Sequence, residues 1–262
     1  MIIPGGPSTG NYRVRSLKNK SLDEQSLKDS KGKIPNLGTN TCSFPAKIFV
    51  INRGDRPDRW ESFQTNNSAL FDRFQISRWD ASVTDHFTPS VVDAIFKSFT
   101  SCLEENLFEE DSIIIMEDDA YLAPGGIEKL QMAWKDLPED WDVLIGNHYF
   151  FGSMEILSDH LAKPDGRAST VNFAVYKKTV VQKIKDFLYL RENEGMRDFD
   201  HFLTSELCGI NNFTVWPMIS REIASFSDHK QVMLDSASKI REHSFKYLFI
   251  DQDSYYSSLK DW

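Results

Sequence analysis

Three consecutive acids are the part of this sequence best suited to chemistry. Glu117, Asp118 and Asp119 directly follow the apolar run 113–116 (IIIM), which has the pattern of a buried strand. In an open α/β sheet, ligands bind beyond the carboxyl ends of the strands. Because side chains alternate along an extended chain, we expect Glu117 and Asp119 on one side and Asp118 on the other.

Carboxylates held this close favour a divalent cation. Two of them about 4 Å apart repel each other by about 4 kcal/mol at an effective dielectric of about 20. Without a cation between them, one would tend to protonate, and Mn²⁺ and Mg²⁺ prefer oxygen ligands. The alternative is that acids follow the strand simply because loops are polar, and Asp118 alone could equally be a turn or cap residue.

The rest of the chain alternates between strand and helix patterns. Short apolar runs predict strands at residues 47–52, 74–79, 113–116, 141–145 and 170–176. Helical spacing, with Thr88-Pro89 as a helix start, predicts helices at about 58–66, from 88 onward, and at about 126–135, 178–190 and 198–207. This order is typical of an α/β fold with a mostly parallel sheet and helices on both faces.

Composition and charge limit the classes of protein to which this chain can belong. The chain has 262 residues, of which 40% are hydrophobic, enough for one sizeable core. Its formal net charge of −9 disfavours non-specific binding to the phosphates of nucleic acids. Cys42, Cys102 and Cys208 lie far apart without metal-ligand spacing, so we expect free thiols in a reducing compartment.

The ends of the chain and its apolar runs indicate location and domains. No segment has the pattern of a signal peptide or the roughly 20 apolar residues of a membrane span, so we expect a cytoplasmic protein. Residues 1–45 are rich in Gly, Ser, Asn and Lys with little hydrophobic periodicity. We therefore predict a flexible N-terminal arm over 1–45 and one domain over 46–262.

Several blocks resemble glycosyltransferase family 25, which includes lipooligosaccharide and procollagen galactosyltransferases. Residues 48–59 (IFVINRGDRPDR) are similar to the opening motif of the family, and residues 113–120 (IIIMEDDA) match its apolar run followed by Glu-Asp-Asp. Later blocks follow in the family's order: 137–143 (LPEDWDV), 198–203 (DFDHFL) and Trp216-Pro217. The resemblance covers roughly residues 46–230 and indicates a divergent member, because residues 94–99 (AIFKSF) keep a Ser but lack the Gly and His of the corresponding family motif.

The resemblance implies a Rossmann-like GT-A fold. It also implies inverting transfer of a hexose or pentose from a nucleotide sugar, such as a UDP-sugar, to a hydroxyl group. Glu117-x-Asp119 would take the place of the family's DxD motif. Asp119 would bind Mn²⁺ or Mg²⁺ between the two phosphates, with Asp118 beside it, and Glu117 or Asp118 would contact the ribose or metal-bound water. The cation would act as a Lewis acid for the departing nucleoside diphosphate.

Donor binding is also expected of residues that follow the first predicted strand. Asn52 belongs to the opening motif. Arg53, Arg56 and Arg59 lie at the mouth of the same crevice, where arginines suit bidentate phosphate contacts or stacking on a base. The alternative for these arginines is local ion pairing with neighbouring aspartates at a solvated helix start.

An inverting transfer needs a base that deprotonates the acceptor hydroxyl. Asp200, in the matched block 198–203, is the candidate; alternatively, it is a carboxylate that interacts with a helix N-terminus. His201, whose side-chain type titrates near neutral pH, and Asn147-His148 are expected on the acceptor side. His229 is a candidate metal ligand from the second half of the chain. Each histidine could instead be an ordinary surface or core residue.

The acceptor and the reaction leave alternatives open. By resemblance, the acceptor is a glycan such as a lipopolysaccharide sugar. A hydroxylated nucleobase of DNA is a second possibility, with the basic residues of the arm supplying phosphate contacts. A hydrolase would use Glu117 and Asp200 as an acid/base pair. The non-enzymatic alternative is a GT-A-like sugar-binding or scaffold protein.

Overall fold

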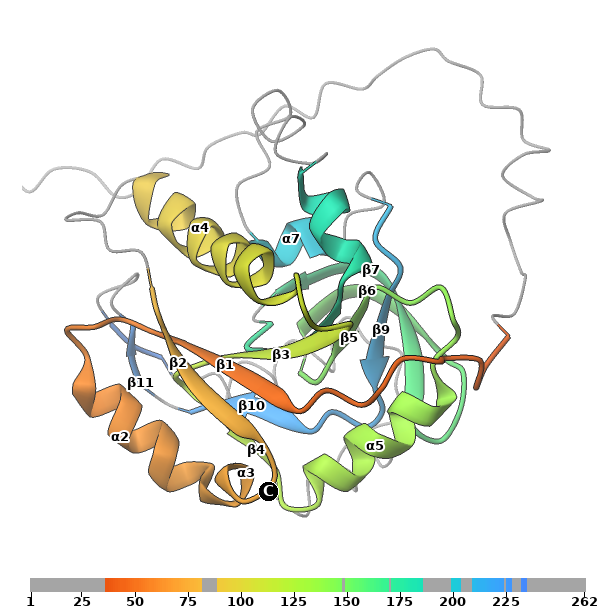
Figure 1. Ribbon diagram of the computed structural model, residues 1–262, viewed down its shortest axis with the longest axis horizontal. Helices are drawn as coiled ribbons and strands as arrows, with labels where there is room; N and C mark the ends of the chain where they lie inside the picture. The colour runs from red at the N-terminus through yellow and green to blue at the C-terminus, as the bar shows by residue number, and fades with distance from the viewer. Residues whose placement is uncertain are drawn as a thin grey trace, which may run out of the picture. The chain divides into compact units, whose positions relative to one another are not determined.

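The fold is built around one eight-stranded sheet (Figure 1). The computed structural model describes residues 36–81, 89–147, 149–169, 171–185, 199–203, 209–223, 225–227 and 232–234. The strands of the large sheet are β1 (Lys47–Asn52), β2 (Gln75–Asp80), β3 (Ser112–Glu117), β5 (Val143–Ile145), β6 (Tyr149–Ile156), β7 (Leu161–Ser169), β8 (Phe173–Lys177) and β9 (Asn212–Val215).

The sheet is mixed, and most of its strands run in the same direction. Its order is β2-β1-β3-β8-β5-β9-β7-β6. Parallel pairs join β1 to β2, β1 to β3 and β5 to β9, whereas β8 is antiparallel to β3 and β5, and β7 is antiparallel to β6 and β9. Only β8 and β7 therefore run against the other six strands. The predicted α/β class with a mostly parallel sheet is confirmed.

Helices cover both faces of the sheet, as predicted (Figure 1). One face carries α4 (Pro89–Asn106), α7 (Phe199–Leu203) and the helical residues 179–185. The other face carries α2 (Pro57–Asn66), α3 (Ser68–Phe71) and α5 (Gly126–Asp136). The helices predicted at 178–190 and 198–207 are confirmed where they are described, and residues 186–190, 198 and 204–207 lie outside the described residues.

Alternate residues of β3 build the two cores. Ile113 and Ile115 pack with α4 and α7, whereas Ile114 and Met116 pack with α2, α3 and α5. All four side chains are at most 1% exposed, and burying each contributes about 1.5–3 kcal/mol. Because β3 is held from both sides, the acidic residues that follow it have a rigid base.

Two smaller sheets complete the described structure. β4 (Ala120–Leu122) pairs with β10 (Ser220–Glu222), and β11 (Ser225–Ser227) pairs with β12 (Val232–Leu234). Both pairs are antiparallel. In the part of the chain that the structure describes, no helix has the length and apolar character needed to cross a membrane.

The segment before β1 packs on the domain. Trp141 Nε1–H donates to Asn40 Oδ1 at 3.0 Å, and the ring of Phe44 meets that of Trp134 edge-on with centroids 5.5 Å apart. The compact unit that holds the sheet begins at Asn36, and the division of the chain at residue 46 stays a prediction. The residues before Asn36 lie outside the described residues, and for them the arm stays a prediction.

Candidate active site

The acidic run lies at the carboxyl end of β3, beside the end of β1. Ile51 of β1 is opposite Glu117, and the chain turns at Asp118 and Asp119 before β4 begins. Asn52, the last residue of β1, donates a hydrogen bond from Nδ2 to Asp118 Oδ2 at 2.6 Å. Two neighbouring parallel strands thus bring a predicted donor-binding residue into contact with the acidic run.

One arginine of α2 holds both aspartates. Arg59 Nη2 lies 2.5 Å from Asp118 Oδ1 and 2.6 Å from Asp119 Oδ2. The side chain of Arg59 is 16% exposed, and those of the aspartates are 9% and 10% exposed. The prediction that Asp118 and Asp119 point to opposite sides is wrong. The chain leaves the extended conformation after Glu117, and the alternation of a strand ends there.

Burial gives these aspartates unusual proton affinities. Burial raises the pKa of Asp118 to about 6, although the charge of Arg59 acts in the opposite direction. Burial and the charge of Glu222 raise the pKa of Asp119 to about 6, again against the effect of Arg59. One guanidinium therefore does not offset the negative charge of the cluster. A further positive charge at this corner would stabilise the ionised carboxylates.

Glu222 is a member of this cluster that the sequence does not reveal. It ends β10, and the pairing with β4 places it opposite Ala120. The N–H of Ile223 donates to Asp119 O at 2.7 Å, which fixes the two segments against each other. No hydrophobic period marks a three-residue strand, so only the tertiary pairing brings Glu222 to the acidic run.

Asp200, the predicted base, belongs to the surroundings of Glu117. It lies in α7, where Phe199 stacks on Phe99 of α4 with ring centroids 4.5 Å apart. The pKa of Glu117 is raised well above its usual range, first by burial and then by the charges of Asp119 and Asp200. The fold thus brings α7 and the end of β3 within electrostatic reach, and the role of Asp200 as a base stays a prediction.

The other two arginines form local ion pairs. Arg53 Nε and Nη2 donate to the two carboxylate oxygens of Asp55 at 3.0 and 2.6 Å. Arg56 contacts Asp58 in the same way, with both distances 2.9 Å. This local ion pairing is the alternative to phosphate binding that the sequence also predicts for these arginines. The aspartate side chains are 58% and 64% exposed, so these pairs are weak, and their exchange for a phosphate stays a prediction.

The residues predicted for the acceptor side are described only in part. Asn147 is 2% exposed, and its Oδ1 accepts hydrogen bonds from two backbone N–H groups at 3.0 and 3.2 Å, so it braces the edge of the sheet. His201 lies in α7, and its side chain is outside the described structure. His148 lies outside the described residues, as does His229, which was predicted as a metal ligand. The roles of all four residues stay predictions.

The site fits a divalent cation that takes most of its ligands from a substrate. Among the described residues, no three or more His, Cys, Asp or Glu side chains are grouped to hold a metal ion by themselves. Asp119 Oδ1, however, is buried without a hydrogen-bond partner in the described structure, in a cluster with excess negative charge. Mg²⁺ commonly binds through one or two carboxylates, water and substrate phosphates. The acidic run offers that many carboxylates.

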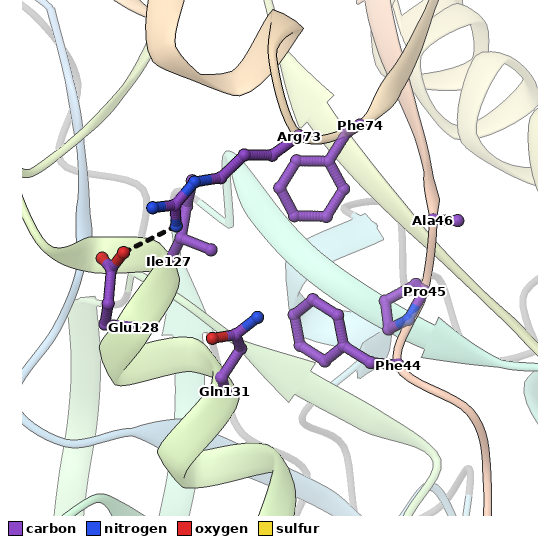
Figure 2. Close-up of a pocket in the computed structure, with 8 residues that line it drawn as sticks. All are labelled: Phe44, Pro45, Ala46, Arg73, Phe74, Ile127, Glu128 and Gln131. Atoms are coloured by element: carbon purple, nitrogen blue, oxygen red, sulfur yellow. Dashed lines mark hydrogen bonds and ion pairs between the residues drawn. The ribbon is translucent and has the colours of Figure 1, made fainter.

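A pocket at the opposite end of β1 is separate from this site (Figure 2). It has a volume of about 500 Å³ and is lined by Phe44, Pro45, Ala46, Arg73, Phe74, Ile127, Glu128 and Gln131. Figure 2 shows Arg73 and Glu128 paired at its rim, 2.6 Å apart. The lining residues 44–46 precede β1, whereas the acidic run lies beyond its other end.

The comparisons with known proteins gave only structural matches; no protein-family model and no curated protein matches this chain. A glycosyltransferase involved in glycosylation of the major capsid of PBCV-1 is 8% identical, over 72% of this chain and 97% of its own, with a TM-score of 0.46. A mannosyltransferase from Pyrobaculum calidifontis, in complex with GDP-Man and Mn²⁺, is 14% identical over 91% and 71%, with a TM-score of 0.42. A Drosophila β1,4-galactosyltransferase 7 mutant, in complex with manganese, UDP-Gal and xylobiose, is 9% identical over 76% and 80%, with a TM-score of 0.40. Likeness at this level does not identify an activity, so the function of this chain is inferred from its own residues.

Proposed function

We propose that this chain is a metal-dependent glycosyltransferase that moves a hexose or a pentose from a nucleotide sugar to a hydroxyl acceptor. The observation that carries the proposal is the buried carboxylate corner, in which Asp119 Oδ1 has no hydrogen-bond partner among the described residues and Arg59 contacts both aspartates. A nucleoside diphosphate adds negative charge there, so a cation is needed to bind it. The resemblance of the acidic run to glycosyltransferase family 25 supports the same function.

In this proposal, each residue of the corner has its own role in binding the cation and the diphosphate. Asp119 binds Mn²⁺ or Mg²⁺, with Asp118 and Glu222 as the neighbouring carboxylates. The bound cation supplies Lewis-acid stabilisation of the charge that develops on the departing diphosphate. Arg59 holds the two aspartates in position, and Asn52 fixes Asp118 from the other side. Because the chain places these groups before substrate arrives, little reorganisation is needed during the reaction.

The transfer exchanges one C–O bond for another. The oxygen of the acceptor hydroxyl attacks the anomeric carbon on the face opposite the leaving group, and its proton passes to Asp200. The bond between the anomeric carbon and the phosphate oxygen breaks, and its electron pair leaves with the nucleoside diphosphate. The configuration at the anomeric carbon is inverted. α7 packs on the face of β3 to which Ile113 and Ile115 point, and Glu117 continues that alternation, so Asp200 and Glu117 share one face.

Donor hydrolysis tests the proposal without knowledge of the acceptor. UDP-glucose, UDP-galactose, UDP-N-acetylglucosamine and GDP-mannose are each incubated with the protein, with and without Mn²⁺, and release of nucleoside diphosphate is measured. We expect slow, Mn²⁺-dependent hydrolysis of at least one donor. Asp119→Asn abolishes it, and Asp72→Asn, a change at an exposed residue that follows α3, does not. Release that is independent of metal, or full activity in Asp119→Asn, would contradict the proposal.

The acceptor we propose is a hydroxyl group of a glycan, such as a lipopolysaccharide sugar. Once a donor is known, a panel of acceptors distinguishes this from transfer to DNA that carries a hydroxylated base. If no nucleoside diphosphate binds in calorimetry with Mn²⁺ present, the result favours a non-catalytic sugar-binding or scaffold protein.

A further inference from the structure

Asn172 is a buried residue whose side-chain amide is satisfied at one end only. It is 1% exposed and directly precedes β8. Its N–H donates to Asn147 Oδ1 at 3.0 Å, and its C=O accepts from the N–H of Glu117 at 2.9 Å. Its Oδ1 accepts from the hydroxyl of Ser220 at 3.2 Å, but Nδ2 has no hydrogen-bond partner in the described structure. A buried amide without a partner is unfavourable, so this position calls for a group that the described residues do not supply.

The group that suits this position is a hydroxyl. The oxygen and nitrogen of an amide are assigned from their partners, and the hydroxyl of Ser220 can donate or accept. Ser220 satisfies one end of Asn172 and leaves the other unpaired in the described structure. The unpaired end is then either an NH₂ donor or a C=O acceptor. A hydroxyl group both donates and accepts, so it pairs with either end, whereas a phosphate oxygen only accepts.

The backbone of Asn172 lies beside that of Glu117, at the end of β3. Met116 and Phe173 are opposite each other in the pairing of β3 with β8, and the hydrogen bond from Glu117 to Asn172 continues that register. The side chain of Asn172 contacts Ser220 of β10, two residues before Glu222. Asn172 therefore lies between the end of β3 and the strand that brings Glu222 to the acidic run.

Glu117 and Asn172 lie between the two reactive ends of the proposed site. Asp119, which we propose binds the cation, is two residues beyond Glu117. On the other side, α7 brings Asp200 within electrostatic reach of Glu117. A sugar that is joined to a diphosphate at Asp119, and is attacked by a hydroxyl that Asp200 deprotonates, would pass close to Glu117 and Asn172.

We propose that Asn172 is a specificity-determining residue that hydrogen-bonds a hydroxyl group of the transferred sugar. The inference rests on the proposed function and adds the residue that distinguishes one sugar from another. Sites built to hydrogen-bond a substrate hydroxyl reject analogues that lack it, because the buried polar group is then left unpaired. Asn172 thus favours donors whose hydroxyl reaches the amide over epimers in which that hydroxyl points away.

The test distinguishes the contribution of the sugar to binding from the contribution of the nucleotide. Dissociation constants of UDP and of UDP-glucose, and likewise of GDP and GDP-mannose, are measured with Mn²⁺ for the wild type, Asn172→Ala and Asn172→Ser. The second variant is smaller than Asn but keeps a hydroxyl for Ser220, so a folded protein is available if the alanine variant is unstable. Asn106→Ala is the matched control, since Asn106 ends α4 and its amide donates to Cys102 O.

We expect both Asn172 variants to weaken binding of a sugar nucleotide by about 3- to 10-fold, the usual effect of one buried neutral hydrogen bond. Binding of the matching nucleoside diphosphate stays unchanged, and Asn106→Ala changes neither. If the ratio of the dissociation constant of the sugar nucleotide to that of the nucleoside diphosphate is the same in the Asn172 variants as in the wild type, the amide is paired with a buried water molecule only. The inference is then overturned, while the proposed function stands. If the wild type binds no nucleoside diphosphate with Mn²⁺, the proposed function fails, and the inference fails with it.

Discussion

Replacing Arg59 by Gln tests whether the carboxylate corner is held together by a single cationic side chain. Arg59 Nη2 is within 2.6 Å of both aspartates, so the two carboxylate oxygens that it contacts lie at most about 5 Å apart. At that separation two negative charges repel by about 3 kcal/mol at an effective dielectric of about 20. Removing one partner of a buried ion pair typically costs 3–5 kcal/mol, because the remaining charge is left buried and uncompensated.

We therefore expect Arg59→Gln to lower the free energy of unfolding by about 3–5 kcal/mol in metal-free buffer at about pH 8. Arg73→Gln is the matched control. Its ion pair with Glu128 has the same N–O distance of 2.6 Å but side chains that are 49% and 50% exposed, so its loss should cost about 0–1 kcal/mol. Urea unfolding followed by circular dichroism measures both.

The decrease in the free energy of unfolding caused by Arg59→Gln should be smaller under two conditions. It shrinks at about pH 5, because Asp118 and Asp119, with pKa values of about 6, then bind protons and lose their charge. It also shrinks when Mn²⁺ is added, because a cation replaces the missing guanidinium. The reasoning is refuted if Arg59→Gln costs no more than Arg73→Gln, or if its loss is the same at both pH values.

Two further predictions concern the base and the pH dependence of stability. Asp200→Asn should lower the turnover of sugar transfer by about 100-fold or more while leaving the dissociation constant of the nucleoside diphosphate unchanged; a collapse of nucleotide binding in calorimetry would instead assign Asp200 to the cation site. For the metal-free protein, the folded-state pKa values of Asp118 and Asp119, about 6, lie above the ordinary value of 3.8, so between about pH 4 and pH 7 the folded state binds more protons than the unfolded state. These two groups therefore lower the free energy of unfolding as pH rises through that window, and urea unfolding of Asp119→Asn should show a flatter pH profile than the wild type; identical profiles would count against the raised pKa of Asp119.

The sequence predicted the central strands and the acidic run because their signals are local. Four large apolar residues in a row are typical of a strand buried on both faces, and β3 spans Ser112–Glu117. The end of such a strand is where an open sheet binds ligands. The pairing of β1 with β3 then brings Asn52 to Asp118, as the parallel arrangement requires.

The hairpin of β6 and β7 was not predictable from local pattern. Gly152, Pro164 and Gly166 interrupt the two strands, and such residues normally argue against a strand. Pro164 is tolerated because β9 pairs with β7 only at Leu161 and Ala162, so the missing N–H removes no hydrogen bond to β9.

The contacts that complete the site depend on tertiary structure. Arg59 was one of three equivalent arginines in the sequence, and only the packing of α2 places it on the aspartates while Arg53 and Arg56 pair locally. Glu222 reaches the acidic run through the pairing of β10 with β4. The direction of β8, which positions Asn172, is not encoded in hydrophobic period, because parallel and antiparallel buried strands have the same apolar composition.

Calorimetric titration of Mn²⁺ into the protein at about pH 8, with UDP or GDP present, tests the central claim most directly. The wild type should bind Mn²⁺ together with one of the nucleotides, since the diphosphate supplies the ligands that the carboxylates do not. Asp119→Asn should lose that binding while its circular dichroism spectrum shows that it is still folded. Absence of Mn²⁺ and nucleotide binding in the folded wild type, or equal binding by wild type and Asp119→Asn, would contradict the account.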